Sequence, residues 1–253
     1  MSAPTPAIVL GGTGYVAGEL LRLIAGHPQL TVAAILSDSQ PGASVADAFA
    51  HLRSAYPELK FAAPDELNAV IRREPVTALF SAAPHGVSAA IVDRLLAAAA
   101  AAGTRVHCVD ISADFRYASQ AAYEAVYKHT HGAPARIREF TCAVPEHLQK
   151  SPTPHIAHPG CFATATLLAS VPLLALGLTD TRLFVTGITG STGSGRKPVE
   201  ATHHPHRHSD LYTYGALSHR HVPEIIACAK LATGIDQSNI LCFQLCSFGR
   251  RSL

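Results

Sequence analysis

The sequence predicts an α/β fold in two parts, and three observations lead to this prediction. Short apolar runs alternate with helical stretches through the first half of the 253 residues. These runs are apolar throughout, as in parallel strands that helices cover on both faces. A cluster of glycines also follows the first run, where a strand turns into a helix.

The elements of the first part follow one another at short intervals. We expect helices at about 15–26 and about 87–101. We expect strands at 7–10, 31–36, 76–82 and 104–109. After Asp114 the alternation loosens, because aromatic and charged residues occur together without a repeat.

A second pattern begins at His155. It consists of a strand, a tight turn, a long helix at 161–176, a strand at 182–189 and a glycine-rich loop. This change places a boundary near residue 155, which gives one domain at 1–155 and another at 156–253.

The composition excludes several classes of protein. Hydrophobic residues make up 48% and charged residues 15%, which argues for a packed core and against disorder. The net charge of +2 argues against a nucleic-acid binder. No apolar run reaches the roughly 18–20 residues of a membrane helix, and the N-terminus lacks the pattern of a secretory signal. The six cysteines form no CxxC motif, so we expect a reduced, cytoplasmic chain.

The glycine-rich segment between the first strand and the first helix reads GGTGYVAG, residues 11–18. Glycines allow the backbone to approach a pyrophosphate, and the helix N-terminus supplies free N–H groups and a positive dipole end. In its strand–turn–helix context the motif predicts a Rossmann-type dinucleotide-binding domain. The residues expected to contact the cofactor here are Gly11, Gly12, Thr13, Gly14, Tyr15 and Val16.

The second strand ends at Ser37-Asp38-Ser39. An acidic residue at this distance from the glycines usually contacts the ribose hydroxyls of NAD, so Asp38 favours NAD. The hydroxyls of Ser37 and Ser39 can instead bind the 2′-phosphate of NADP. No arginine stands in this loop, and the residue types alone leave the choice between the two cofactors open.

Cys161 is the candidate nucleophile. The turn His158-Pro159-Gly160 places it at the N-terminus of the long helix. The dipole and the free N–H groups of that helix end favour the thiolate, and they can hold an oxyanion that forms when sulfur attacks a carbonyl. A free cysteine is more often a small buried hydrophobe, and we prefer that interpretation for Cys108 and Cys228.

A nucleophilic cysteine needs a nearby base, and the segment HRHVPEI at 219–225 is the best source of one. Pro223 marks a helix start, so His219 and His221 lie in the loop before it and Glu224 lies in its first turn. Glu224 can orient a histidine as carboxylates do in catalytic triads. For His219 alone, a surface histidine without a catalytic role is the alternative.

Two further segments are less specific. The glycine-rich loop at 187–195 lacks the lysine and the serine or threonine of a phosphate loop, so we expect a flexible loop near a ligand and no ATP site. The histidine run at 203–208 suggests zinc or nickel, but Pro205 interrupts it and no regular spacing forms a tetrahedral site. We therefore expect a polar loop over the active site and no metal.

Together these segments resemble the N-acetyl-γ-glutamyl-phosphate reductases, which are relatives of the aspartate-semialdehyde dehydrogenases. The resemblance runs from Ile8 to about Ile225. It rests on GGTGYVAGEL (11–20), APHGVS (83–88), VDISADFR (109–116), VPEHL (144–148), HPGCFATA (158–165), the 187–195 loop and HRHVPEI (219–225). The order of these motifs along the chain is more specific than any one of them.

The resemblance implies an NADPH-dependent reduction of N-acetyl-γ-glutamyl phosphate to N-acetylglutamate 5-semialdehyde in arginine biosynthesis, through a thioester on Cys161. It implies His221 as the acid or base, with His219 as the second choice, and an oligomer of identical chains. It implies Ser112 and Arg116 as substrate ligands. The further cofactor contacts that it implies are Ser37, Ser39, Pro84, His85, Gly86 and Gly193.

The sequence departs from the family pattern in two places. Phe162-Ala163 follows the cysteine where the family commonly has Tyr-Pro. The tail from Cys242 to Leu253 matches nothing in the family, so we expect the second, α+β domain for substrate binding and dimerisation to be truncated. Three alternatives stay open: a reductase of aspartyl phosphate or of a carrier-linked lysine-pathway intermediate, a metal-binding or regulatory protein without turnover, and a folded but inactive remnant.

Overall fold

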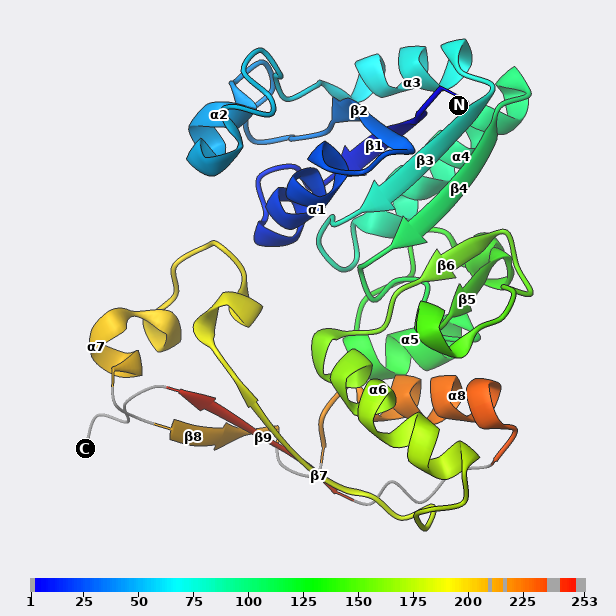
Figure 1. The fold of residues 1–253 in the computed structure, drawn as a ribbon, viewed down its shortest axis with the longest axis vertical. Helices are drawn as coiled ribbons and strands as arrows, with labels where there is room; N and C mark the ends of the chain where they lie inside the picture. The colour runs from blue at the N-terminus through cyan, green and yellow to red at the C-terminus, as the bar shows by residue number, and fades with distance from the viewer. Residues whose placement is uncertain (1–2, 209–210, 216–217, 236–241, 249–253) are drawn as a thin grey trace. The chain divides into compact units, whose positions relative to one another are not determined.

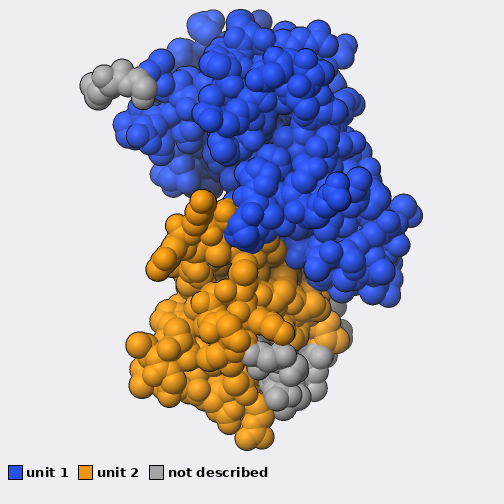
Figure 2. All heavy atoms as spheres, turned by 90° about the vertical axis from the view of Figure 1, so that its right-hand side faces the viewer, with its two compact units in different colours: residues 1–141, 152–157 blue, residues 142–151, 158–253 orange. Residues whose placement is uncertain are grey.

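The computed structural model describes residues 3–208, 211–215, 218–235 and 242–248. The chain forms two compact units (Figure 2). The first unit comprises Met1–Thr141 and Pro152–Ala157, and the second comprises Cys142–Ser151 and His158–Leu253. Between residues 141 and 158 the chain therefore passes into the second unit, returns to the first at Pro152–Ala157, and then continues in the second unit.

The first unit is built on a six-stranded sheet with the order β2-β1-β3-β4-β6-β5 (Figure 1). β1 pairs with β2 and β3, β3 pairs with β4, and β4 pairs with β6, all in parallel. The strands are β1 (Thr5–Leu10), β2 (Leu30–Ile35), β3 (Val76–Ser81), β4 (Arg105–Asp110), β5 (Phe140–Cys142) and β6 (His155–Ala157). The α/β fold expected from the alternating apolar runs is confirmed.

Helices connect these strands, and α3 and α4 pack side by side (Figure 1). The helices are α1 (Tyr15–Ala25), α2 (Val45–Ala48), α3 (Pro64–Arg73), α4 (Ser88–Ala102) and α5 (Gln120–Tyr127). Short 3-10 turns of this unit lie at Ala50–Leu52 and Pro134–Glu139. The helices expected at 15–26 and 87–101 correspond to α1 and α4, whereas α3 and α5 were not expected.

The carboxyl ends of β1, β3 and β4 meet at one edge of the sheet. Leu10 pairs with Ser81, and Ser81 pairs with Asp110. β2 lies on one side of β1 and β3 on the other, so the chain crosses over in opposite directions at β1. Ligands of doubly wound sheets bind outside the carboxyl ends of the strands at such a switch point.

A hydrophobic core holds α1 against this part of the sheet. Ala7 to Leu10 of β1 are buried, and so are Leu21 and Ile24 of α1. Burial of a side chain such as Leu21 contributes roughly 1.5–3 kcal/mol to folding. The same packing fixes the first turn of α1 beside the carboxyl end of β1.

The second unit contains a three-stranded sheet with the order β7-β9-β8. Its strands are β7 (Phe184–Thr189), β8 (Leu211–Tyr214) and β9 (Cys242–Phe248), and its helices are α6 (Cys161–Ala175), α7 (His204–Arg207) and α8 (Val222–Thr233). Short 3-10 turns lie at Pro145–His147, Ser191–Ser194 and Glu200–Thr202. β9 runs parallel to β7 and antiparallel to β8. The strand and the long helix expected in this part correspond to β7 and α6.

α6 and α8 pack against each other in the second unit (Figure 1). Their contact is an apolar core of buried residues: Val144, Phe162, Ala163, Leu167, Val171, Ile225, Cys228 and Ala229. Phe162 and Ile225 belong to the first turns of the two helices. The core therefore fixes the start of α6 beside the start of α8.

Residues 242–248 of the tail form a strand of the second sheet. Residues Cys242–Phe248 form β9, which lies between β7 and β8. Its backbone pairs with both neighbours, so this segment has a place in the second sheet although it carries none of the short family motifs. Residues 249–253 lie outside the described residues. Among the helices that the structure describes, none is long and apolar enough to cross a membrane.

Candidate active site

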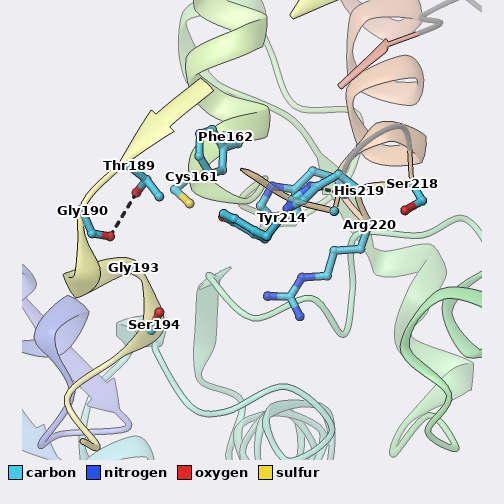
Figure 3. Close-up of a pocket in the computed structure, with 12 residues that line it drawn as sticks. Cys161, Phe162, Thr189, Gly190, Gly193, Ser194, Tyr214, Ser218, His219 and Arg220 are labelled. Carbon is cyan, nitrogen blue, oxygen red and sulfur yellow. Dashed lines mark hydrogen bonds between the residues drawn. The ribbon is translucent and has the colours of Figure 1, made fainter. Parts of the chain in front are cut away.

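Cys161 lies in a pocket of about 460 Å³ in the second unit (Figure 3). The pocket draws on the start of α6, the loop after β7, the end of β8 and the segment before α8. Its lining residues are Cys161, Phe162, Thr189, Gly190, Gly193, Ser194, Tyr214, Gly215, Ser218, His219, Arg220 and His221. Chemistry-bearing residues that lie far apart in the sequence therefore share one cavity.

Cys161 is the first residue of α6, and its side chain is exposed to the pocket. Gly160 precedes it in extended conformation, and no acidic residue stands in the first turn of the helix. The positive end of a 15-residue helix and its free N–H groups therefore lie beside the sulfur. Cys108 and Cys228, by contrast, are buried as expected, and burial together with the charge of Asp110 raises the pKa of the Cys108 thiol.

Two residues from the start of α8 hold the turn before Cys161. The Gly160 N–H donates a hydrogen bond to Oε1 of Glu224 at 2.7 Å. The imidazole of His221 lies directly against Gly160, so that a methyl group at Gly160 would overlap the ring. Glu224 and His221 are both buried. Glu224 and His221 therefore both contact the turn that precedes Cys161.

His219 lies on the pocket wall in different surroundings. Its ring packs edge-on against Phe162, Tyr214 and His221, with centroids 5.9, 6.0 and 4.5 Å away. The His221 N–H donates to Nδ1 of His219 at 3.2 Å, so the proton of the neutral ring lies on Nε2. Burial, and next the charge of Arg220, lower the pKa of His219 to about 4. The ring is therefore a neutral Nε2–H donor near pH 7.

Arg220 and Tyr214 are pocket residues that the sequence did not single out. The guanidinium of Arg220 is exposed and extends into the open space of the pocket (Figure 3). Such a group can pair with two oxygens of a phosphate or carboxylate. A signal for it was present, because Arg220 stands inside the HRHVPEI motif.

A second pocket, of about 280 Å³, lies in the first unit around the glycine turn; we call it the cradle. Its lining residues are Gly11, Gly12, Thr13, Gly14, Leu36, Ser37, Asp38, Ser39, Ala82, Ala83, Pro84, Val87 and Ile91. It lies outside the carboxyl ends of β1, β2 and β3, at the switch point of the sheet. A pyrophosphate at this position would meet the N-terminus of α1.

The cradle fits a dinucleotide because its glycines carry no side chains that would keep a ligand away from the backbone. Gly11 has a φ of +75°, and a methyl group there would overlap the carbonyl of Ala82. A methyl group on Gly12 would lie 2.6 Å from a side-chain carbon of Ile35. The side of Gly14 is open, with its nearest atom at 3.4 Å. The first two glycines thus close the turn onto the sheet, and the third leaves room for a ligand.

The 37–39 loop presents two hydroxyls at the edge of the cradle. The Oγ atoms of Ser37 and Ser39 lie 3.3 Å apart, and the Gln40 N–H donates to the Ser37 Oγ at 3.2 Å. Asp38 also lines the cradle. Both of the alternatives that the residue types left open, a 2′-hydroxyl and a 2′-phosphate, therefore have partners here.

Several expected cofactor contacts lie elsewhere. Tyr15 and Val16 are exposed on the first turn of α1 but do not line the cradle. His85 and Gly86 do not line the cradle, and His85 Nδ1 accepts the Ala113 N–H at 2.9 Å. Gly193 lines the cysteine pocket of the second unit and not the cradle. Its place follows from the loop after β7, which belongs to the second sheet.

The expected substrate ligands Ser112 and Arg116 are buried in the first unit. The Ser112 hydroxyl donates to Oδ2 of Asp110 at 2.6 Å. Arg116 Nη2 donates to the carbonyl of Ile111 at 2.7 Å. Neither residue lines the cradle or the cysteine pocket, and these bonds hold the 110–116 loop together.

The histidine run at 203–208 forms part of α7 and the turn before it. The rings of His204 and His208 have centroids 5.3 Å apart. Within the residues that the structure describes, no three side chains of histidine, cysteine, aspartate or glutamate gather as metal ligands.

Two family models match the chain. The model of the semialdehyde dehydrogenase NAD binding domain matches residues 6–147, and that of the semialdehyde dehydrogenase dimerisation domain matches residues 161–250. The second match continues past Ile225 and includes β9. The expectation that the resemblance stops near Ile225 is therefore wrong.

The chain is similar to curated proteins named N-acetyl-gamma-glutamyl-phosphate reductase. It is 40% identical over 231 residues to the protein of Pseudomonas putida strain W619 and 39% identical to that of Pseudomonas aeruginosa PAO1. Each match covers 90% of this chain and 64% of the relative, so the chain spans about two thirds of their length. In fold, it is similar to aspartate semialdehyde dehydrogenase from Candida albicans, solved with NADP, with a TM-score of 0.59 and 15% identity over 99% of this chain and 69% of that one.

Proposed function

The chain belongs to the semialdehyde dehydrogenase family, and we propose on this basis that it reduces N-acetyl-γ-glutamyl phosphate to N-acetylglutamate 5-semialdehyde with NADPH. One observation carries the proposal. Cys161 stands exposed at the N-terminus of α6, in a pocket that also contains His219 and Arg220. A nucleophile, a hydrogen-bond donor and a cation in one cavity suit the attack on an acyl phosphate.

The substrate is proposed from the relatives. The curated proteins that share 39–40% identity with this chain carry the name of the N-acetyl-γ-glutamyl-phosphate reductase. They are longer than this chain, which spans 64% of their length. A reductase of aspartyl phosphate or of a carrier-linked acyl phosphate would use the same thiol chemistry, and a panel of acyl phosphates separates these substrates.

NADPH is the proposed cofactor, and when bound it supplies the hydride that reduces the thioester. The glycines at 11–14 would hold the pyrophosphate at the start of α1. The hydroxyls of Ser37 and Ser39 would bind the 2′-phosphate, since two neutral donors at 3.3 Å from each other can share its oxygens. Asp38 stands between them and would contact the adjacent ribose.

Cys161 forms the covalent bond to the substrate. Its thiolate attacks the carbonyl carbon, the carbon–sulfur bond forms, and the bond to the phosphate oxygen breaks. Phosphate leaves and takes up a proton from solvent. The N–H groups at the start of α6 and the Nε2–H of His219 would stabilise the oxyanion that develops on the carbonyl oxygen, an effect worth about 2.7–4 kcal/mol for each well-placed donor.

His221 and Glu224 act through the cysteine turn. The family resemblance favoured His221 as the acid or base, with His219 second. The burial of His221 and its contact with Gly160 support a positioning role for it and a direct role for the more exposed His219. Glu224 fixes the backbone of Gly160 by its 2.7 Å hydrogen bond.

The anion of the substrate would pair with Arg220, which reaches into the pocket. Ser112 and Arg116 are buried and bonded within the 110–116 loop, so their role is to support that loop.

The match to a dimerisation domain supports an oligomer of identical chains, and a biosynthetic step of this kind supports a cytoplasmic location.

The experiment is an assay with N-acetylglutamate 5-semialdehyde, phosphate and NADP, in which the appearance of NADPH is followed at its absorption band. Wild-type protein should reduce NADP only when phosphate is present. Cys161→Ser should lose at least about a thousandfold in turnover, because a hydroxyl at a helix end is a far weaker nucleophile. A Cys161→Ser protein with full activity would exclude the thioester, and a folded wild type without turnover would favour an inactive remnant.

A further inference from the structure

We propose that Asp114 is a positioning residue for the nicotinamide cofactor, because its carboxylate holds the wall segment 84–89, of which Pro84 and Val87 line the cradle. This inference rests on the cofactor binding proposed above. Asp114 belongs to the VDISADFR motif, and residues 84–88 belong to the APHGVS motif. Asp114 does not line the cradle itself, so it would act through the wall.

Each oxygen of the Asp114 carboxylate accepts one backbone N–H of that wall. Gly86 N donates to Oδ1 at 2.8 Å, and Ala89 N donates to Oδ2 at 2.9 Å. Ala89 lies in the first turn of α4, whose positive end favours a carboxylate. Hydrogen bonds to an ionised acceptor are about twice as strong as neutral ones. The carboxylate thus joins the loop and the helix start into one unit.

The two hydrogen bonds lie on either side of Val87, which lines the cradle. Pro84 and Val87 line the cradle, and Val87 stands between the two bonded residues. Gly86 has a φ of +80°, a conformation that glycine adopts readily and other residues rarely. Without the carboxylate, the segment would lose the hydrogen bonds on both sides of Val87, and the bond from the Val87 N–H to the Pro84 carbonyl would remain.

Asp114 is itself held in place. Its side chain is buried, and the Tyr123 hydroxyl donates to Oδ1 at 3.1 Å. Burial, and next the charge of Asp114, raise the pKa of Tyr123, which keeps the phenol protonated as a donor. The Ala133 N–H donates to Nδ1 of His131, so His131 Nε2–H donates to the Asp114 carbonyl at 2.6 Å. Side chain and main chain of Asp114 are therefore both fixed.

Two further bonds join the same two segments. The Ala113 N–H donates to Nδ1 of His85, and the Ser88 hydroxyl donates to Oδ1 of Asp110 at 2.6 Å. Asp110 is also buried, and burial raises its pKa against the hydrogen bonds from Ser112 and Ser88 that lower it. Asp114 is the member of this network whose carboxylate reaches the backbone on both sides of Val87.

The experiment compares Asp114→Asn with Asp93→Asn in the full chain. Asp93 lies on α4, is about half exposed, and pairs with Arg136. The Kd of NADPH is measured from the fluorescence of the nicotinamide, which no tryptophan of this chain disturbs. Asp114→Asn should weaken NADPH binding about tenfold, since one amide N–H₂ would face a backbone N–H. Asp93→Asn should stay within about twofold of the wild type.

Tyr123→Phe provides a second variant that keeps the carboxylate and the fold. It removes one hydrogen bond to Oδ1 and should weaken NADPH binding about two- to threefold. Amide hydrogen exchange at Gly86 and Ala89 should accelerate in both variants. The alkylation rate of Cys161 by iodoacetamide, a readout from the second unit, should not change.

Unchanged NADPH affinity in both variants would overturn the inference. Faster exchange at Gly86 and Ala89 with unchanged affinity would also overturn it, because the contact would then serve the fold alone. A folded wild type that binds neither NADPH nor NADH would remove the proposed cofactor together with this role. This last result is distinguishable from an unchanged affinity in the variants, which requires a wild type that binds.

Discussion

The cradle of the first unit and the cysteine pocket of the second are shaped by different means. In the cradle, Gly11 and Gly12 lie so close to neighbouring strand ends that a methyl group would overlap them. In the pocket, the turn before Cys161 is held by His221 and Glu224, and the Glu224 contact joins residues 64 positions apart. The cradle is thus shaped by the close approach of backbone at neighbouring strand ends, and the pocket by side chains from the start of α8.

This difference predicts that a glycine-to-alanine substitution lowers turnover when it is made in the pocket and lowers cofactor affinity when it is made in the cradle. Gly160→Ala adds a methyl group that must displace the His221 ring and shift the turn. We expect turnover to fall about a hundredfold or more, because a shift near 1 Å of a reacting group has that effect. NADPH binding should stay within about twofold. Turnover is measured with the semialdehyde assay and binding by nicotinamide fluorescence.

Gly12→Ala is the counterpart in the cradle. Its methyl group would meet Ile35 and the carbonyl of Leu36, so NADPH binding should weaken by at least about tenfold. The alkylation rate of Cys161 should stay unchanged. Gly26→Ala is the control, since no atom lies within 4 Å of the added methyl group. If both pocket and cradle variants lost cofactor affinity alike, the two sites would not be shaped independently.

Glu224 tests whether the cysteine turn needs its distant support. Glu224→Ala removes the acceptor of the Gly160 N–H and leaves that group buried. We expect turnover to fall about ten- to a hundredfold, in line with an unsatisfied buried donor that costs about 1–3 kcal/mol. Glu224→Gln keeps an acceptor oxygen and should recover most of the activity. Equal losses in the two variants would mean that the charge, and not the hydrogen bond to the turn, is what matters.

The sequence predicts the cradle better than it predicts the pocket. The glycine turn, Ser37 and Ser39 follow directly from strand ends that lie next to one another in the sequence. Such local patterns determine where the carboxyl ends of parallel strands lie. His85 and Gly86 were placed on the wall of the cradle, but their orientation depends on hydrogen bonds to residues 113 and 114. No local pattern contains those contacts.

The pocket depends on pairings between distant segments, which one sequence does not reveal. Cys161 was identified because a turn and a helix start are local signals. Tyr214 was missed because it comes from β8, a strand paired with the tail through β9. The tail carries none of the short family motifs, and its place depends on the pairing of β9 with β7.

Residues 64–73 contain a proline at the helix start, acidic residues in the first turn and arginines in the last, so α3 was predictable.

Cofactor choice provides a smaller test of the cradle. Ser39→Ala removes one hydroxyl near the Ser37 Oγ without changing the backbone. We expect the preference for NADPH over NADH to fall about tenfold, from the loss of one hydrogen bond to a charged phosphate. The ratio of kcat/KM values for the two cofactors measures it. Ser54→Ala, at an exposed position away from the cradle, is the control; an unchanged ratio in Ser39→Ala would assign the 2′-phosphate to other groups.

The smallest expected effect concerns His219 and pH. Burial and Arg220 lower its pKa from 6.5 to about 4 in the folded protein. Between these two values the unfolded chain binds a proton that the folded chain does not, so the stability that His219 contributes above about pH 6.5 is lost as the pH falls toward 4.

His219→Gln should therefore flatten the decline of the melting temperature between pH 7 and pH 5, by a few degrees at most because the ring is partly exposed. Thermal melting at several pH values measures this slope, with the exposed His203→Gln as the matched control. An identical slope in wild type and His219→Gln would mean that the ring takes up a proton as readily in the folded protein as in the unfolded chain. His219 would then be a cation at pH 5 and not the neutral Nε2–H donor proposed above.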